Sequence, residues 1–239
     1  MKTKYWEKYF NDKVKSEGEQ FKKADYGSEI SFKARYNVIK EFLSGQKNLD
    51  RVKILDAGCG IGLLKNIVGK ACEVIGLDLS TEALKHAKEQ GEIPIKATVT
   101  NIPLKSAFEY VFCIEVLQYI DEWQNAVREL VNMTKNNGFL IISTLNKKCL
   151  LLRPKVLKIL KKLGFTKMDE NIVLHDKEDI VEELEKLGMD IIANKDLPIP
   201  IKGGKFLLNV STILGLRHLF SYSFMIIAKK KTQSRISLT

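Results

Sequence analysis

The sequence predicts an α/β protein whose parallel sheet is covered by helices on both faces. As far as residue 146, short apolar runs alternate with amphipathic helical segments, which is the pattern of repeated strand–helix units. The run Tyr110–Ile114 is apolar without alternation, as expected of a strand buried on both faces. A glycine-rich segment, Gly58–Gly62, lies between one strand and one helix and marks a sheet edge where ligands bind in such folds.

Each element follows from a local pattern. Strands are expected at the apolar runs Val52–Leu55, Glu73–Asp78, Ile95–Val99, Tyr110–Ile114, Phe139–Thr144, Asp190–Ala193 and Phe224–Ala228. Helices are expected at Leu63–Lys70, Ser80–Gln90, Trp123–Thr134 and 176–187. The Ser80 hydroxyl can cap the second helix, and Gly188 is suited to end the fourth. A turn at Asn136–Gly138, a connector at Leu197–Gly204 and a frayed basic tail at Lys229–Thr239 complete the prediction.

The composition is that of a globular protein with an uneven charge. The chain has 239 residues, of which 45% are hydrophobic and 28% charged, and its formal net charge is +10. Residues 48–146 carry a net −2, whereas residues 147–168 carry +8 and residues 195–239 carry +7. Residues 1–47 carry +4 and residues 169–194 carry −7. The positive charge therefore belongs to segments outside the sheet core, which argues against a uniformly basic protein that coats nucleic acid.

Cysteine usage and hydropathy indicate a cytoplasmic protein. No two cysteines have C-x-x-C spacing and the three histidines add no ligand pattern, so reduced thiols and no metal site are expected. The N-terminus has no apolar core of a secretory signal. The largely apolar stretch Phe206–Ala228 has Arg217 and His218 in its middle, and a central Arg costs about 2.5–3.5 kcal/mol in a membrane. A transmembrane helix is therefore not expected.

The strongest functional pattern is Asp56-x-Gly58-x-Gly60-x-Gly62 between a strand and a helix. Glycines allow a tight turn and close approach to a ligand, and the free N–H groups of the helix N-terminus favour a polar or anionic ligand. Asp78 lies 20 residues after Gly58, at the end of the next strand. In such folds this acid accepts both hydroxyls of a ribose. The two features together predict a nucleoside cofactor.

The spacing argues against a dinucleotide. The fingerprint G-x-G-x-x-G requires glycine at position 63, where this chain has Leu63. The run instead resembles motif I of class I S-adenosylmethionine-dependent methyltransferases, similar to the small-molecule (type 11) family that includes quinone-biosynthesis O-methyltransferases. The resemblance continues in order and covers about residues 50–146, through Val74–Asp78, Thr98–Leu104, Cys113–Ile120 and Asn136–Thr144.

The resemblance implies S-adenosylmethionine as cofactor and a Rossmann-like, seven-stranded sheet whose last strand is antiparallel. In the family, the first loop holds the methionine end of the cofactor, the second acid binds ribose and the next residue lies against adenine. The implied cofactor-binding residues are Asp56, Ala57, Gly58, Cys59, Gly60, Gly62, Asp78, Leu79, Thr98, Val99, Cys113 and Glu115. The chain departs from the family at Thr98, where an acid is usual, and a hydroxyl makes a weaker hydrogen bond there than a carboxylate would.

His175 is the candidate catalytic base, because the quinone-pathway enzymes carry a similar His-Asp pair after the fifth strand. It would deprotonate or orient a phenol. The structural alternative has equal weight, since Asp176 is a natural helix cap and His175 merely precedes it. Glu115 ends the fourth strand near the expected methyl position, where it contacts cofactor or substrate or only caps the loop. No G-K-[ST], G-x-S-x-G or H-E-x-x-H motif supports a competing chemistry.

The sequence says less about the methyl acceptor. The strand end Cys113–Val116 lacks the Asn-x-x-[Tyr/Phe] motif of methyltransferases that modify amino groups of bases. Arg153–Phe165 is a basic amphipathic segment with Pro154 at its first helical position. Such a helix is either a membrane-surface element or a lid with solvated lysines. The apolar stretch Phe206–Phe220 precedes the last strand and suits a lipid-linked or otherwise apolar acceptor.

We therefore predict a cytoplasmic S-adenosylmethionine-dependent methyltransferase, with peripheral contact to the inner membrane surface as an option. Its acceptor is a small molecule or is lipid-linked, and O-methylation is preferred. Residues 1–47 are expected to form an N-terminal helical cap and residues 48–239 the catalytic domain, with a basic insertion at about 147–175. Two alternatives stay open: an RNA methyltransferase whose basic blocks follow the phosphates, and a non-catalytic cofactor-binding regulator.

Overall fold

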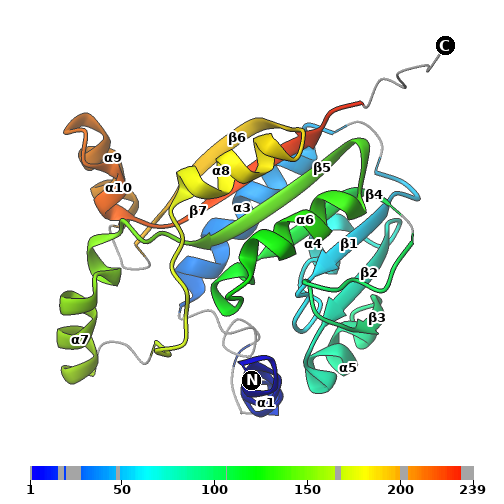
Figure 1. The fold of residues 1–239 in the computed structure, drawn as a ribbon, viewed down its shortest axis with the longest axis horizontal. Coiled ribbons are helices and arrows are strands. Elements are labelled where there is room, and N and C mark those ends of the chain that lie inside the picture. Colours follow the sequence, from blue (N-terminus) through cyan, green and yellow to red (C-terminus); the bar gives the residue numbers. More distant parts are fainter. Residues whose placement is uncertain are drawn as a thin grey trace.

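The computed structural model describes residues 2–15, 19, 28–46, 49–105, 107–164, 168–199 and 204–232. These residues form a seven-stranded sheet of order β3-β2-β1-β4-β5-β7-β6 (Figure 1). Its strands are β1 (Lys53–Ala57), β2 (Glu73–Asp78), β3 (Ile93–Lys96), β4 (Phe108–Ile114), β5 (Thr134–Leu145), β6 (Met189–Pro198) and β7 (Ser221–Lys230). The first five pair in parallel, whereas β7 is antiparallel to both β5 and β6. The predicted Rossmann-like fold with an antiparallel last strand is confirmed.

Helices cover both faces of this sheet. They are α1 (Lys2–Lys15), α3 (Glu29–Ser44), α4 (Lys65–Val68), α5 (Thr81–Glu89), α6 (Trp123–Met133), α7 (Pro154–Lys162), α8 (Lys177–Lys186), α9 (Gly204–Ile213) and α10 (Arg217–Phe220). Two short 3₁₀ turns, η1 (Leu117–Tyr119) and η2 (Leu150–Leu152), follow β4 and β5. Alternate residues of β1 lie on opposite faces: Leu55 belongs to the apolar cluster that includes Leu130 of α6, whereas Ile54 belongs to the one that includes Ile39 of α3. The central strands are thus buried on both sides.

Three local predictions were wrong. The helix expected at Leu63–Lys70 is reduced to α4, because Gly62 and Gly69 have φ of +77° and +86° and so break a regular helix at both ends. The third strand ends at Lys96 rather than Val99, since the next residues turn and Thr98 pairs with Asn101. The turn expected at Asn136–Gly138 lies within β5, whose register with β4 shifts at this point.

The second half of the chain follows its predicted helices. α7 begins at Pro154, α8 begins directly after Asp176, and Gly188 adopts a φ of +82° after the end of α8. Residues 16–18, 20–27 and 47 of the predicted cap, 165–167 of the insertion, 200–203 of the connector and 233–239 of the tail lie outside the described residues. In the described part of the chain, no helix is long and apolar enough to cross a membrane.

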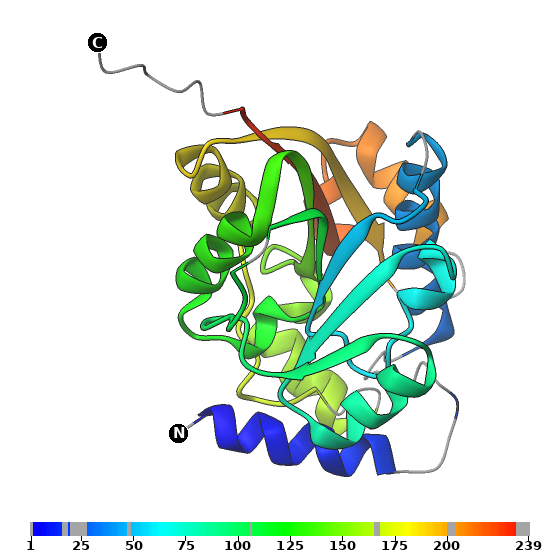
Figure 2. The ribbon, with the colours of Figure 1, turned by 90° about the vertical axis from the view of Figure 1, so that its right-hand side faces the viewer.

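Helix α1 lies across the carboxyl edge of the parallel strands (Figure 2). Asn11 fixes it to the N-terminus of α5, because its Oδ1 accepts hydrogen bonds from Ser80 Oγ at 2.9 Å and from the Glu82 amide at 3.1 Å. An ion pair of 2.6 Å between Lys96 and Glu7 adds a contact to the end of β3. The inner face of α1 buries Trp6 and Val14, so this helix covers whatever the sheet edge binds.

Two glycines of the loop, Gly60 and Gly62, allow a test of how closely α5 packs against it. A Cβ at Gly62 would lie 2.7 Å from Ala87 Cα, whereas a Cβ at Gly60 would meet nothing within 4 Å, and both residues have positive φ. We expect Gly62→Ala to lower the free energy of unfolding by about 2–4 kcal/mol, from left-handed strain plus overpacking. Gly60→Ala should cost about 1–2 kcal/mol from strain alone. Urea denaturation without ligand measures both, and equal losses would contradict the close packing of α5 on the loop.

Candidate functional site

The glycine loop after β1 is held in place by the end of β2. The amides of Gly58 and Cys59 both donate to the Leu77 carbonyl, at 2.6 and 3.0 Å. Gly58 has a φ of +81°, and a Cβ there would lie 2.2 Å from a methyl group of Val116. Only glycine fits this position, because both the conformation and the space exclude a side chain. The loop therefore passes closely between β2 and the end of β4.

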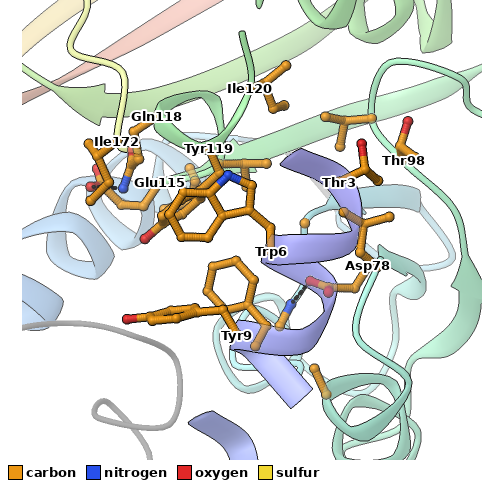
Figure 3. Close-up of a pocket in the computed structure, with 18 of the residues that line it drawn as sticks. Thr3, Trp6, Tyr9, Asp78, Thr98, Glu115, Gln118, Tyr119, Ile120 and Ile172 are labelled. Carbon is orange, nitrogen blue, oxygen red and sulfur yellow. Dashed lines mark hydrogen bonds between the residues drawn. The ribbon is translucent and has the colours of Figure 1, made fainter. Parts of the chain in front are cut away.

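Asp78 is the last residue of β2, and its carboxylate lies at the sheet edge in contact with this loop. Its Oδ2 accepts a hydrogen bond from the Gly60 amide at 2.9 Å (Figure 3), and its Oδ1 accepts one from the Ser80 amide at 2.8 Å. Burial raises the pKa of Asp78, while the backbone hydrogen bonds from Ser80, Gly60 and Leu79 lower it. The Gly60 and Ser80 amides bond to different oxygens of Asp78, and a carboxylate oxygen accepts more than one hydrogen bond, so each oxygen can still accept one from a ligand hydroxyl.

Two more acids lie buried behind the loop. Burial, followed by the charge of Asp78, raises the pKa of Asp56 to about 7. Burial, followed by the charge of Asp56, raises the pKa of Glu92 to about 9, and only 3% of Glu92 is exposed. A Cβ on Gly76 would lie 2.2 Å from Glu92 Oε2, so the glycine in β2 makes room for this carboxyl. Burial also raises the pKa of the Cys59 thiol, which disfavours a reactive thiolate in the loop.

A cavity of about 680 Å³ opens along this edge, between the sheet and α1. One end is lined by residues of the glycine loop, β2 and the segment after β3, namely Gly58, Gly60, Asp78, Leu79, Thr98 and Val99. The other end is lined by residues after β4 and from the second half of the chain, including Glu115, Gln118, Tyr119, Ile172 and Tyr222. Figure 3 shows Trp6 and Tyr9 of α1 between these two ends. The volume is ordinary for a small-molecule site.

Glu115 is the most constrained side chain at the far end. It has a φ of +60°, a left-handed conformation that costs a non-glycine residue free energy and is typical of functional positions. Its Oε1 lies 2.7 Å from Arg35 Nε and accepts a hydrogen bond from Ser143 Oγ at 2.9 Å. Its Oε2 accepts one from Gln118 Nε2 at 3.3 Å. These contacts fix the carboxylate at the cavity wall.

Arg35 connects this carboxylate to the fold. Its side chain is almost completely buried, and it donates hydrogen bonds to the Ser31 carbonyl at 2.8 Å and to Ser223 Oγ at 2.8 Å. The guanidinium thereby joins α3, β7 and the end of β4. Removing one partner of a buried ion pair leaves an uncompensated charge, so Arg35 and Glu115 depend on each other.

The structure brings together most of the residues predicted from the sequence. The predicted residues that line the cavity are Gly58, Gly60, Asp78, Leu79, Thr98, Val99 and Glu115. The predicted residues that lie behind its wall are Asp56, Ala57, Cys59, Gly62 and Cys113. Thr98 Oγ1 lies 2.5 Å from Thr100 Oγ1 and accepts a hydrogen bond from the Thr100 amide, so it shapes the turn as well as the wall.

His175 lies apart from the cavity. It is 4% exposed and is not among the described residues that line the cavity. Its Nε2 lies 3.1 Å from the Leu117 carbonyl, its ring packs edge-on against Trp123, and its backbone pairs with Asn146 after β5. Burial lowers its pKa, which favours a neutral ring that donates to the carbonyl.

The two N-terminal helices, α1 and α3, also line the cavity, which no motif in the sequence predicted. Trp6 and Phe10 of α1 pack against Tyr119 with ring centroids 4.7 and 5.0 Å apart, and all three line the cavity. Arg35 of α3 lines it as well. The four aromatic residues at 5, 6, 9 and 10 follow helical spacing, which was the one available sign of an aromatic helix face. In the described residues, no group of three or more metal-ligating side chains is present.

The glycine loop and Asp78 lie in a segment that is similar to a known protein family. Residues 55–142 match the family described as methyltransferase domain. The ubiquinone biosynthesis O-methyltransferase of Nitrosomonas europaea is 31% identical over 124 residues, which are 47% of this chain and 51% of that protein. The malonyl-[acyl-carrier protein] O-methyltransferase of Enterobacter lignolyticus is 38% identical over 97 residues, 39% of each chain. The chain therefore spans about half the length, or less, of these curated relatives.

The fold likeness extends over nearly the whole chain. The crystal structure of magnesium protoporphyrin IX methyltransferase from Synechocystis, with S-adenosylhomocysteine bound, has a TM-score of 0.68 to this structure. The match covers 95% of this chain and 99% of that one, at 19% sequence identity. At this identity the match establishes the class I methyltransferase fold and nothing more specific.

The buried carboxyl of Glu92 predicts a pH-dependent stability. Its pKa in the fold is about 9, above its ordinary value, so the folded state binds the proton more tightly and stability falls as pH rises between about 4.5 and 9. Glu92→Gln removes the contribution of Glu92, leaves that of Asp56 below about pH 7, and should raise the free energy of unfolding at pH 8 by about 1–3 kcal/mol. Urea denaturation at pH 5, 7 and 8 measures the effect. Glu89→Gln, an exposed site at the end of α5 and three residues before Glu92, is the control, and an equal gain there would contradict the assignment.

Proposed function

We propose that this chain, whose residues 55–142 belong to the methyltransferase-domain family, is an S-adenosylmethionine-dependent methyltransferase. The supporting observation is the position of Asp78, which ends β2 on the cavity wall and is oriented by the Gly60 and Ser80 amides. A carboxylate held in this way suits the two hydroxyls of a ribose. The glycine loop would receive the methionine part of the cofactor, and Leu79, Thr98 and Val99 would border its adenine.

In this proposal the protein accelerates methyl transfer mainly by positioning the acceptor and by excluding water from the site. The cofactor supplies a methyl group already activated by a sulfonium, so orientation of the acceptor provides most of the rate. α1 covers the cavity with Trp6 and Phe10, which keep bulk water from the reacting atoms. In this proposal the predicted cap within residues 1–47 completes the site as well as covering it.

We propose an apolar or lipid-linked small molecule as the acceptor, methylated on oxygen. The far end of the cavity includes Leu145 and Tyr222, which also belong to an apolar cluster with Leu152 and Phe220. The wall at this end is therefore partly apolar, which suits an apolar acceptor. Both curated relatives described above are O-methyltransferases by name, which supports oxygen as the acceptor atom.

Glu115, rather than His175, is the side chain that we propose contacts the acceptor. Its Oε2 receives only the 3.3 Å hydrogen bond from Gln118 among the contacts described above, so it can accept another from an acceptor hydroxyl. In the base role, Glu115 would take the hydroxyl proton as the oxygen–methyl bond forms and the sulfur–methyl bond breaks. For His175 we propose a positioning role, because its ring connects the segment before α8 to η1.

Cofactor binding tests the central proposal. We expect Asp78→Ala to weaken binding of S-adenosylhomocysteine at least 100-fold, because two hydrogen bonds to a charged group are lost at about 1.5–3 kcal/mol each. Glu73→Gln, at the exposed opposite end of the same strand, should bind as the wild type does. Isothermal titration calorimetry measures both. No binding by the wild type, or undiminished binding by Asp78→Ala, would contradict the cofactor site.

Transfer assays separate Glu115 from His175. With methyl-labelled cofactor and a total lipid extract as the acceptor pool, we expect Glu115→Gln to lose about 10²-fold or more of the transfer rate while still binding S-adenosylhomocysteine. His175→Asn should keep its rate within a few-fold. Thermal denaturation of each variant shows whether a loss of transfer rate is due to unfolding, and Glu115→Asp, which keeps the carboxylate, serves as the conservative control. The opposite ranking of the two variants would assign the base role to His175.

A further inference from the structure

Glu92 is a buried carboxyl group that the proposed methyl transfer does not use. It follows α5, and its amide donates a hydrogen bond to the Ala87 carbonyl at 3.0 Å, so the end of this helix fixes its backbone. The residue is almost completely buried, and neither carboxyl oxygen makes a hydrogen bond of ordinary geometry to the described residues. A carboxylate without partners is costly in such a place, so burial by itself favours the protonated form.

The carboxyl group fills the space behind the glycine loop. A Cβ on Gly76 of β2 would lie 2.2 Å from Glu92 Oε2 and 2.9 Å from Cys59 Sγ, so the carboxyl group and the loop thiol meet over the same glycine. Cys59 is itself one of the residues that hold the loop, because its amide donates to the Leu77 carbonyl at 3.0 Å. Neither Cys59 nor Glu92 is among the described residues that line the cavity. Glu92 therefore supports the loop from behind.

The charged and titratable groups around this carboxyl group do not compensate an ionised form. Burial, followed by the charge of Asp56 in β1, raises the pKa of Glu92 to about 9. The Lys65 amide, the Cys59 thiol and the Lys65 charge lower this pKa, but by less. The Lys65 ammonium group binds elsewhere, since it donates to the Cys72 carbonyl at 2.6 Å. An ionised Glu92 would therefore face a repelling carboxylate and no hydrogen-bonded cation in the described part of the chain.

We propose that Glu92 is a positioning residue for the ligand-binding loop: its protonated carboxyl group keeps the glycine loop in place, and its ionisation displaces the loop and weakens binding at Asp78. The amide of Gly60, the residue after Cys59, orients the Asp78 carboxylate, so a shift of the loop at Cys59 changes the groups that face the cavity. This inference rests on the proposed function for its ligand. Because the bound form favours the proton, affinity is constant at low pH and falls as pH rises through the pKa of Glu92.

Calorimetry with S-adenosylhomocysteine at pH 7 and pH 10 tests the effect on binding. Glu92→Gln keeps the shape of the side chain without a charge, and we expect it to bind within about threefold of the wild type at pH 7. The ratio of the wild-type affinity to that of Glu92→Gln should then fall about tenfold by pH 10, which is one unit above the pKa of Glu92. Titration of the ligand itself affects both proteins and cancels in this ratio. Glu89→Gln, an exposed site at the end of α5, should follow the wild-type profile.

Thiol labelling follows the loop without any ligand. We expect iodoacetamide to modify Cys59 at equal rates in the wild type and Glu92→Gln at pH 7, and about tenfold faster in the wild type at pH 10, as measured by peptide mass spectrometry. Cys113 in β4, which is completely buried, is the internal reference and should be modified equally in both proteins. Faster labelling of Cys113 as well as Cys59 in the wild type would indicate global unfolding and overturn the local role.

The two measurements also separate this inference from the proposed function. Equal labelling of Cys59 in the two proteins, or parallel affinity profiles, overturns the positioning role and leaves Glu92 as a packing residue. A wild type that binds no S-adenosylhomocysteine at pH 7 contradicts the proposed function, and the labelling of Cys59 then decides the role of Glu92 alone. A wild type that binds this ligand through Asp78 with no dependence on Glu92 contradicts the positioning role alone.

Discussion

The site depends on the hydrogen bonds by which the end of β2 holds the glycine loop. Parallel pairing places Ala57 of β1 opposite Leu77 of β2, so the loop leaves β1 within reach of the Leu77 carbonyl and the Asp78 carboxylate. That carbonyl receives two amides and that carboxylate a third. Left-handed conformations at Gly58, Gly60 and Gly62 turn the loop tightly enough for these bonds to form. The same turn leaves the cavity side of the loop open to a ligand.

This arrangement brings acids together in a region with little water. Burial raises the pKa of Asp56, Asp78 and Glu92, and the charge of one acid raises the pKa of another. Asp78 differs because three backbone groups favour its ionised form. The neutral form of Glu92 avoids a second buried charge behind the loop. The carboxyl group with backbone hydrogen bonds from the loop is thus at the cavity wall, where a ligand can use it, and Glu92 is behind the wall.

The sequence was sufficient for the features that local rules determine. Strand–helix alternation predicted the sheet, and the spacing from Gly58 to Asp78 predicted which side chains meet at its edge. It was insufficient for contacts between residues that are far apart in the chain. Arg35 and Glu115 are 80 positions apart in the chain, and no local pattern predicts their 2.7 Å contact. The His175–Asp176 pair likewise has the same local sequence whether its ring faces a cavity or the Leu117 carbonyl.

The two ends of the cavity also come from different parts of the chain. The end at Asp78, where we propose that the cofactor binds, is lined by the glycine loop and the ends of β2 and β3, all within residues 55–142, the segment that matches the methyltransferase domain. Helix α1 lies along both ends, and the far end adds Arg35, Ile172 and Tyr222, all outside that segment. Similarity to known enzymes therefore supports the cofactor more strongly than the acceptor. Arg35 balances the charge of Glu115, so this buried pair brings a carboxylate to the far end of the cavity without adding net charge there, beside the apolar Leu145 and Ile172.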